Sequence, residues 1–151
     1  MEKQQVAAFK IVGIAVRTTN ENQQAAIDIP ALWGRFMAEQ VLERIPNKVD
    51  STIYCVYTDY EKDHTKPYTT ILGCKVSSSD AVPEGMVLKE INAGEYQHQT
   101  VKGNLMQGAV VEAWMKIWDS AIPRTYTTDF EVYGATAHDP TNGEMEIYLA
   151  V

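Results

Sequence analysis

The sequence predicts an α+β domain built from two β-α-β-β modules. Several stretches rich in Val, Ile and Tyr alternate between two faces, as strands do, and two stretches between them place apolar residues at helical spacing. Both helical stretches end at an Ile-Pro pair and lead into a strand that contains Val-Tyr. We therefore expect a pseudo-twofold repeat of antiparallel sheets, with helices on one face and a ligand cleft between the modules.

The size of the chain fits one domain, because 151 residues can bury a core without disulfides or metal. We expect a single domain over residues 1–151, with module one at about 6–78 and module two at about 86–151. Cys55 and Cys74 lie in predicted strands without CxxC spacing, so we interpret them as small buried hydrophobic residues.

The composition limits the partners of the protein. The net charge of −7, without a Lys/Arg cluster, argues against direct nucleic-acid binding and favours a weak attraction for cations. No apolar run is long enough to cross a bilayer, and the N-terminus lacks the basic and apolar regions of a secretory signal. We therefore expect a cytoplasmic protein that is a monomer or a weak homodimer and does not contact membranes.

Module one begins with a predicted strand in which Gly13 marks a bulge or a close backbone approach. Asp28 and Pro30 predict the start of an amphipathic helix, and Ile45-Pro46 predicts its end. A charged loop of hairpin size joins the last two strands. The predicted strands are 7–19, 51–60 and 68–78, and the helix carries Trp33 and Phe36 on its apolar side.

Module two repeats this order after a link at 79–85. A long extended stretch is interrupted at Asn92-Ala93-Gly94, and Asn104 with Gln107 resembles a capping box that opens the second helix. Ile122-Pro123 predicts the end of that helix. The predicted strands are 86–102, 129–133 and 144–151, and the helix carries Trp114 and Trp118 on its apolar side.

The two modules align at their helix exits. Ile53-Tyr54-Cys55-Val56-Tyr57 then matches Asp129-Phe130-Glu131-Val132-Tyr133, so that Cys55 in module one takes the position of Glu131 in module two. Ligand sites favour the seam between such modules.

The candidate site follows from strand alternation. Asp129, Glu131 and Tyr133 share one face of their strand. In the last strand Glu144, Glu146, Tyr148 and Ala150 share one face, opposite Met145, Ile147, Leu149 and Val151. We expect the apolar row to lie under a helix and both polar rows to line a groove on the other face. The candidate ligand-binding residues are Glu131, Glu146, Tyr133, Tyr148, Tyr57, Trp33, Phe36, Trp114 and Trp118.

A carboxylate among aromatic rings suits a flat lipophilic cation. A bound cation offsets the desolvation of the carboxylate, and each ring adds about 0.5–2 kcal/mol of cation–π attraction. The alternatives are that the carboxylates are solvated and that the tryptophans belong to the core. In addition, a one-residue shift of register turns Glu131 toward the helices.

Motifs for other chemistry are missing from the sequence. His64, His98 and His138 do not form a metal-ligand spacing, and P-loop, GxGxxG and GxSxG motifs are absent. We predict no metal, no cofactor and no catalytic residue of those classes.

The ordered pieces TIYCVYTDYEKD, YTTILGCKV, VPEGMVLKEINAGEYQHQTVKG, AWMKIWDSAIP, DFEVYG and EMEIYLAV resemble the AraC-type effector-binding domain, also called the GyrI-like small-molecule-binding domain. The resemblance covers nearly the whole chain. It implies two β-α-β-β modules about a pseudo-dyad, with a cleft in which a glutamate among aromatic residues binds lipophilic cations. The matching position is Glu131, and Glu146 is the other candidate.

The resemblance also implies a bacterial protein of multidrug binding or transcription regulation. Many members carry a DNA-binding helix-turn-helix ahead of this domain, whereas few residues precede the first strand here, so we expect a stand-alone binding protein rather than a transcription factor by itself. One alternative is a hydrolase of strained electrophilic rings that uses Glu131 with Tyr133 or Tyr148. Another is a protein-interaction role, with gyrase or a separate regulator as the partner.

Overall fold

One antiparallel sheet of eight strands forms the centre of the protein in a computed structural model that describes residues 2–105, 108–138 and 142–151. Its strand order is β1-β6-β8-β7-β3-β4-β2-β5, which confirms the predicted α+β class. The strands are β1 (Glu2–Val6), β2 (Phe9–Thr18), β3 (Ile53–Thr58), β4 (Tyr68–Val76), β5 (Val87–Ile91), β6 (Gly94–Gly103), β7 (Thr128–Tyr133) and β8 (Gly143–Ala150). The helices are α1 (Ala25–Ala38), α2 (Val41–Arg44) and α3 (Ala109–Trp118), with 3-10 turns η1 (Glu21–Gln23) and η3 (Ala135–His138).

The predicted repeat is present as β2-α1-β3-β4 and β6-α3-β7-β8. The sheets of the two modules are joined into one, because β3 pairs with β7. In that pairing Cys55 is the direct partner of Glu131. Since these two residues occupy equivalent positions in the repeat, the pseudo-twofold axis passes between them.

The strand that precedes each module in the sequence pairs with the other module. β1 pairs with β6 of module two, and β5 pairs with β2 of module one. β1 is the strand that the sequence did not predict, since its first four residues are polar and exposed. The exchange places β1 and β5 at the two edges of the sheet.

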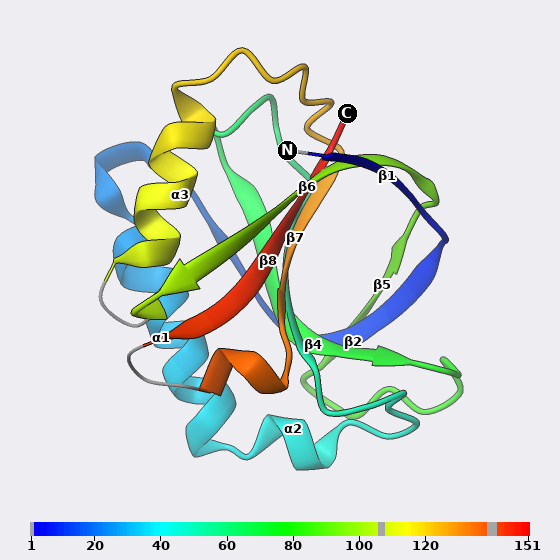
Figure 1. Ribbon diagram of the computed structural model, residues 1–151. Helices are drawn as coiled ribbons and strands as arrows, with labels where there is room; N and C mark the ends of the chain where they lie inside the picture. The colour runs from blue at the N-terminus through cyan, green and yellow to red at the C-terminus, as the bar shows by residue number, and fades with distance from the viewer. Residues whose placement is uncertain (1, 106–107, 139–141) are drawn as a thin grey trace.

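Both long helices cover the same face of the sheet (Figure 1). Under α1 and α3 lie two apolar clusters, which share the half-buried Tyr57 and Tyr133. The opposite face is filled around Phe130, whose ring lies 4.7 Å from that of Tyr148, 5.3 Å from that of Tyr96 and 5.4 Å from that of Phe9. A groove on the face away from the helices, as predicted from alternation, is therefore replaced there by an aromatic core.

The ends of the helices differ from the sequence prediction. α1 begins at Ala25, so both Asp28 and Pro30 lie inside it. Asp28 is in the first turn and does not cap the helix; instead its carboxylate accepts hydrogen bonds from the side chains of Thr18 and Gln24. α1 ends at Ala38, and the short α2 follows after the left-handed residue Gln40. The predicted capping box involves Gln107, which lies outside the described residues.

The backbones of β2 and β4 approach each other closely at a pair of glycines. Gly13 is paired with Gly73, and a Cβ atom on Gly13 would lie 1.9 Å from the carbonyl oxygen of Leu72. The predicted close approach at Gly13 is confirmed.

Cys55 and Cys74 are buried free thiols. In the described part of the chain, no helix is long and apolar enough to cross a membrane.

Candidate aromatic-box site

Glu131 is a carboxylate in the buried layer between the sheet and the helices. Its side chain is on the same face as Ile147, its partner on β8, and the residue is 1% exposed. Three donors surround it: Tyr57 Oη donates to Oε2 over 3.0 Å, Trp114 Nε1 donates to Oε2 over 2.6 Å, and Tyr133 Oη donates to Oε1 over 2.6 Å. Each carboxylate oxygen therefore accepts at least one hydrogen bond.

The donors belong to a nearly symmetric set of rings, which we call the aromatic box: Trp33, Tyr57, Trp114 and Tyr133. Tyr57 and Tyr133 are equivalent in the repeat, and each meets the tryptophan of the other module edge to face. The ring centroids of Trp33 and Tyr133 are 5.1 Å apart, and those of Trp114 and Tyr57 are 5.3 Å apart. The box thus encloses the pseudo-twofold axis. The symmetry is broken at Glu131, because the equivalent position in module one, its strand partner, is Cys55.

The carboxylate has no positive partner in the described parts of the chain, where the ion pairs involve other acidic residues. Burial raises the pKa of Glu131, while the hydrogen bonds from Tyr133, Trp114 and Tyr57 oppose that rise. Burial and the nearby carboxylate raise the pKa of Tyr133 well above its ordinary value, so this phenol stays a donor. The result is a buried acidic group that is hydrogen-bonded but not charge-compensated.

Three members of the box are only half-buried, although the carboxylate itself is enclosed. Trp33, Tyr57 and Tyr133 retain some exposure, whereas Trp114 is 8% exposed. The rings of Trp33, Tyr57 and Tyr133 therefore separate solvent from Glu131. Access to the carboxylate requires these rings to move apart.

Glu146 and Tyr148 do not join this site, which corrects the predicted groove. Glu146 is paired with Val132 on β7, so it lies on the face opposite Glu131. There its Oε1 is 3.1 Å from Nε2 of His98, and the His98 ring stacks on Tyr148 with centroids 4.6 Å apart. The alternation within each strand was right, but the register between β7 and β8 places Glu131 beside the apolar row of β8.

The remaining two candidates, Phe36 and Trp118, are not members of the aromatic box. Phe36 is 1% exposed and packs edge to face against Trp33, so it supports the box from the core. Trp118 is 38% exposed and stacks on His64 with centroids 5.7 Å apart. Trp118 therefore belongs to a neighbouring surface stack rather than to the box.

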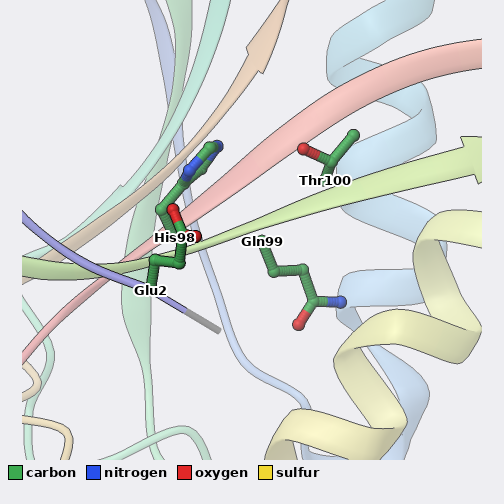
Figure 2. Close-up of a pocket in the computed structure, with 4 residues that line it drawn as sticks. All are labelled: Glu2, His98, Gln99 and Thr100. Atoms are coloured by element: carbon green, nitrogen blue, oxygen red, sulfur yellow. The ribbon is translucent and has the colours of Figure 1, made fainter.

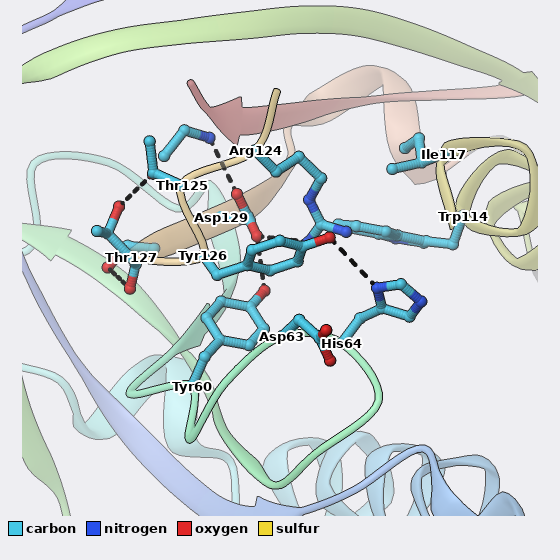
Figure 3. Close-up of polar contacts among 12 residues, drawn as sticks. Tyr60, Asp63, His64, Trp114, Ile117, Arg124, Thr125, Tyr126, Thr127 and Asp129 are labelled. Atoms are coloured by element: carbon cyan, nitrogen blue, oxygen red, sulfur yellow. Dashed lines mark hydrogen bonds and ion pairs between the residues drawn. The ribbon is translucent and has the colours of Figure 1, made fainter. Parts of the chain in front are cut away.

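A second buried polar group, next to the box, was missed from the sequence. Asp129 is 0% exposed and shares the helix-facing side of β7 with Glu131. Arg124 Nη2 and Tyr60 Oη both contact its Oδ2, at 2.8 and 2.6 Å, and the backbone N–H of Ala150 donates to Oδ1 over 2.9 Å (Figure 3). The sequence signal was the polar alternation of Asp129 with Glu131, but nothing marked Arg124 as its partner.

The sheet edge carries a shallow hollow of about 520 Å³ away from the aromatic box, shown in Figure 2. It lies where β1 meets β6 at the pair of Glu2 with His98. None of the box residues lines it, and the described side chains offer no group of three or more His, Cys, Asp or Glu for a metal ion. The lining residues are Glu2, His98, Gln99 and Thr100.

Comparisons with known proteins agree with this architecture. An integron cassette protein from the mobile metagenome of Vibrio cholerae is 29% identical, with a TM-score of 0.76, and the match covers 99% of this chain and 94% of that one. The structure of SAV2435 bound to tetraphenylphosphonium is 17% identical with a TM-score of 0.82, and the match covers 99% of this chain and 92% of that one; it supports the fold.

The protein YobU of Bacillus subtilis strain 168 is 27% identical over 146 residues, which are 94% of this chain and 91% of YobU. The model of one family, described as integron-associated effector binding protein, matches residues 4–151. The chain therefore belongs to the family of integron-associated effector-binding proteins.

Proposed function

We propose that the protein binds lipophilic organic cations in the aromatic box, with Glu131 as the counter-ion. The observation that carries the proposal is the arrangement of Glu131: a fully buried carboxylate, held by three aromatic donors, without a basic partner among the described residues. A buried uncompensated charge is costly, and such groups are typical of functional sites.

The chemistry of the box matches a cation without hydrogen-bond donors. The three donors already occupy the carboxylate oxygens, so a ligand gains little from donating and much from its charge and apolar surface. Each aromatic face contributes about 0.5–2 kcal/mol of cation–π attraction when water is excluded. The related fold of SAV2435, which was solved with tetraphenylphosphonium, supports this class of ligand.

Binding requires the two edge-to-face pairs to open. Trp33 with Tyr133 and Trp114 with Tyr57 close over the carboxylate, and a ligand replaces each ring contact with a contact to itself. The contacts that are lost contribute about 0.5–1.5 kcal/mol per pair, which is similar to the cation–π gain. The Coulombic attraction to Glu131 then decides the balance in favour of a cation.

The test is a titration of tryptophan fluorescence with tetraphenylphosphonium. Because Trp114 donates to Glu131, we expect saturable quenching in the wild type and a loss of affinity of about 30-fold or more in Glu131→Gln. Glu146→Gln is the matched control, since it removes the same charge from the opposite face of the sheet. Equal losses in both variants would mean that only the net charge of the protein matters.

Hydrolysis of a strained electrophile is a second candidate, because Tyr133 Oη lies 2.6 Å from the Glu131 carboxylate. In this role Glu131 activates water and the phenol donates to the opening ring. Incubation with an electrophilic cyclopropane distinguishes the two functions. Product in excess over protein supports hydrolysis, and an intact compound at saturating protein rejects it.

A further inference from the structure

Arg124 is a buried cation next to the aromatic box that uses only part of its hydrogen-bonding capacity. Its side chain is 3% exposed, and Nη2 forms an ion pair with Asp129 Oδ2 at 2.8 Å. Nε and Nη1 are also buried, and neither has a hydrogen-bond partner in the parts of the chain that the structure describes. A guanidinium carries five N–H donors, and buried donors are normally satisfied.

Asp129 is not able to satisfy these donors. Its Oδ2 already accepts from Arg124 Nη2 and from Tyr60, and its Oδ1 accepts from the backbone of Ala150. The contact to Arg124 is therefore made by one nitrogen rather than by two. A second carboxylate or a sulfonate matches the remaining donors, because such groups accept parallel hydrogen bonds from a guanidinium.

The guanidinium of Arg124 lies against two aromatic rings. Its Cζ lies 4.4 Å from the ring centroid of Tyr126 and 5.8 Å from that of Trp114. Tyr126 holds this position with a φ of 55°, in the left-handed region that residues other than glycine seldom adopt. Figure 3 shows Arg124 among Tyr126, Trp114 and His64. Two rings therefore lie against the guanidinium, whose Nε and Nη1 have no hydrogen-bond partner among the described residues.

The position of Arg124 connects it to the proposed cation site. Trp114 contacts both groups: its ring lies against Arg124, and its Nε1 donates to Glu131. Asp129 and Glu131 are two residues apart on the same face of β7, a separation of about 7 Å for extended backbone. A single drug-sized molecule spans that distance.

The nearby basic side chain of His64 adds no positive charge near neutral pH. His64 lies beside Tyr126, with Nδ1 3.5 Å from the phenol oxygen. Burial and the nearby Arg124 lower the pKa of His64. Arg124 is therefore the group that would attract an anion.

We propose that Arg124 forms an anion subsite beside the aromatic box, so that the preferred ligands are lipophilic cations that also carry a carboxylate or a sulfonate. The proposal rests on the proposed function, which supplies the cation site at Glu131. It adds a specificity that Glu131 alone does not provide. Between two ligands of the same shape, the protein should select the one with an anionic group.

Tetramethylrhodamine and its methyl ester test this proposal, because they share one cationic ring system and differ in a free carboxylate. Fluorescence anisotropy is measured with the wild type and with the double variant Arg124→Gln/Asp129→Asn, which removes both charges of the ion pair and so does not leave Asp129 as an unpaired carboxylate. We expect the wild type to bind the acid about tenfold more tightly than the ester. In the double variant the acid should lose this advantage, while the ester keeps its affinity.

The unchanged affinity for the ester shows that the double variant is folded and that the box is intact. Equal affinities of the wild type for both dyes would overturn the proposal and leave cation binding at Glu131 in place. Equal weakening of both dyes in the double variant would also overturn it, because Arg124 would then only position Trp114. If neither dye binds to the wild type, the proposed function fails as well.

Discussion

At Glu131 the two modules carry side chains of different chemistry. Module one carries Cys55 at the equivalent position, a buried thiol that packs in the core under α1. The same backbone environment therefore accepts a small apolar side chain, and the fold does not need a carboxylate there. The acid is retained against a desolvation cost, as is typical of a binding residue.

The raised pKa of Glu131 predicts a pH-dependent stability. A raised pKa means that the folded protein binds the proton more tightly than the unfolded chain, so the ionised carboxylate destabilises the folded state at neutral pH. The cost is about 1.4 kcal/mol for each unit of pKa shift, and it disappears as the pH falls through the raised pKa toward the unfolded value. Wild type should therefore gain stability relative to Glu131→Gln as the pH falls from 8 to 4.

Urea unfolding of both proteins at several pH values measures this difference. Any effect of the amide that does not depend on pH cancels when the free energies of unfolding are compared across the series. A constant difference between pH 8 and pH 4 would contradict the raised pKa and the uncompensated charge.

Alternation within strands predicted which residues share a face, but not which faces come together. Asp129, Glu131 and Tyr133 do lie together, as do Glu146 and Tyr148. The pairing of Glu131 with Ile147 follows from the register between β7 and β8, which depends on long-range contacts that one strand does not encode. The sequence therefore identified the members of the aromatic box and placed Glu131 on the wrong face.

At the scale of elements, the pairing of β2 with β4 depends on two glycines that face each other. Gly13 and Gly73 are paired, and a Cβ on Gly73 would lie 2.1 Å from the carbonyl oxygen of Val12. Backbone atoms in the middle of a sheet move only if the ladder is distorted. The close approach holds β2 against β4 directly beneath α1.

Gly13→Ala should destabilise the protein by roughly 2–4 kcal/mol, because the new methyl group collides with backbone rather than with a mobile side chain. Gly34→Ala is the matched control: Gly34 is exposed in α1 with nothing within 4 Å of an added Cβ. There alanine should stabilise by about 0.5–1 kcal/mol through helix propensity. Urea unfolding that gives both variants the same sign of change would contradict this packing argument.

Element types were more predictable than their ends. The sequence pattern predicted both long helices and every strand except β1. β1 was missed because its side chains are polar and only backbone pairing with β6 makes it a strand. The start of α1 was placed too late because Asp28 and Pro30 are both inside the helix.

At the scale of the whole molecule, the exchange of β1 and β5 ties the modules together. The strand that precedes each module forms the outer edge of the other module, and β3 pairs with β7 at the centre. Separating the modules would expose strand edges on both sides of each half. Sequence periodicity detected the repeat but not the exchange, which has no local signal.

We predict that residues 1–151 unfold as one cooperative unit. Calorimetry should show a single transition whose calorimetric and van't Hoff enthalpies agree, because neither module keeps a complete sheet without the other. Two resolved transitions would show that the modules are separate folding units.

The central claim is that Glu131 selects ligands by charge, and a pair of isosteres tests it most directly. 1-Methylquinolinium and 1-methylnaphthalene have the same shape and differ in the positive ring nitrogen. Calorimetric titration of the wild type should give a preference for the cation of about tenfold or more, and Glu131→Gln should abolish that preference while the neutral compound binds as before. Equal weakening of both compounds in the variant would contradict the account, because Glu131 would then shape the box without acting as a counter-ion.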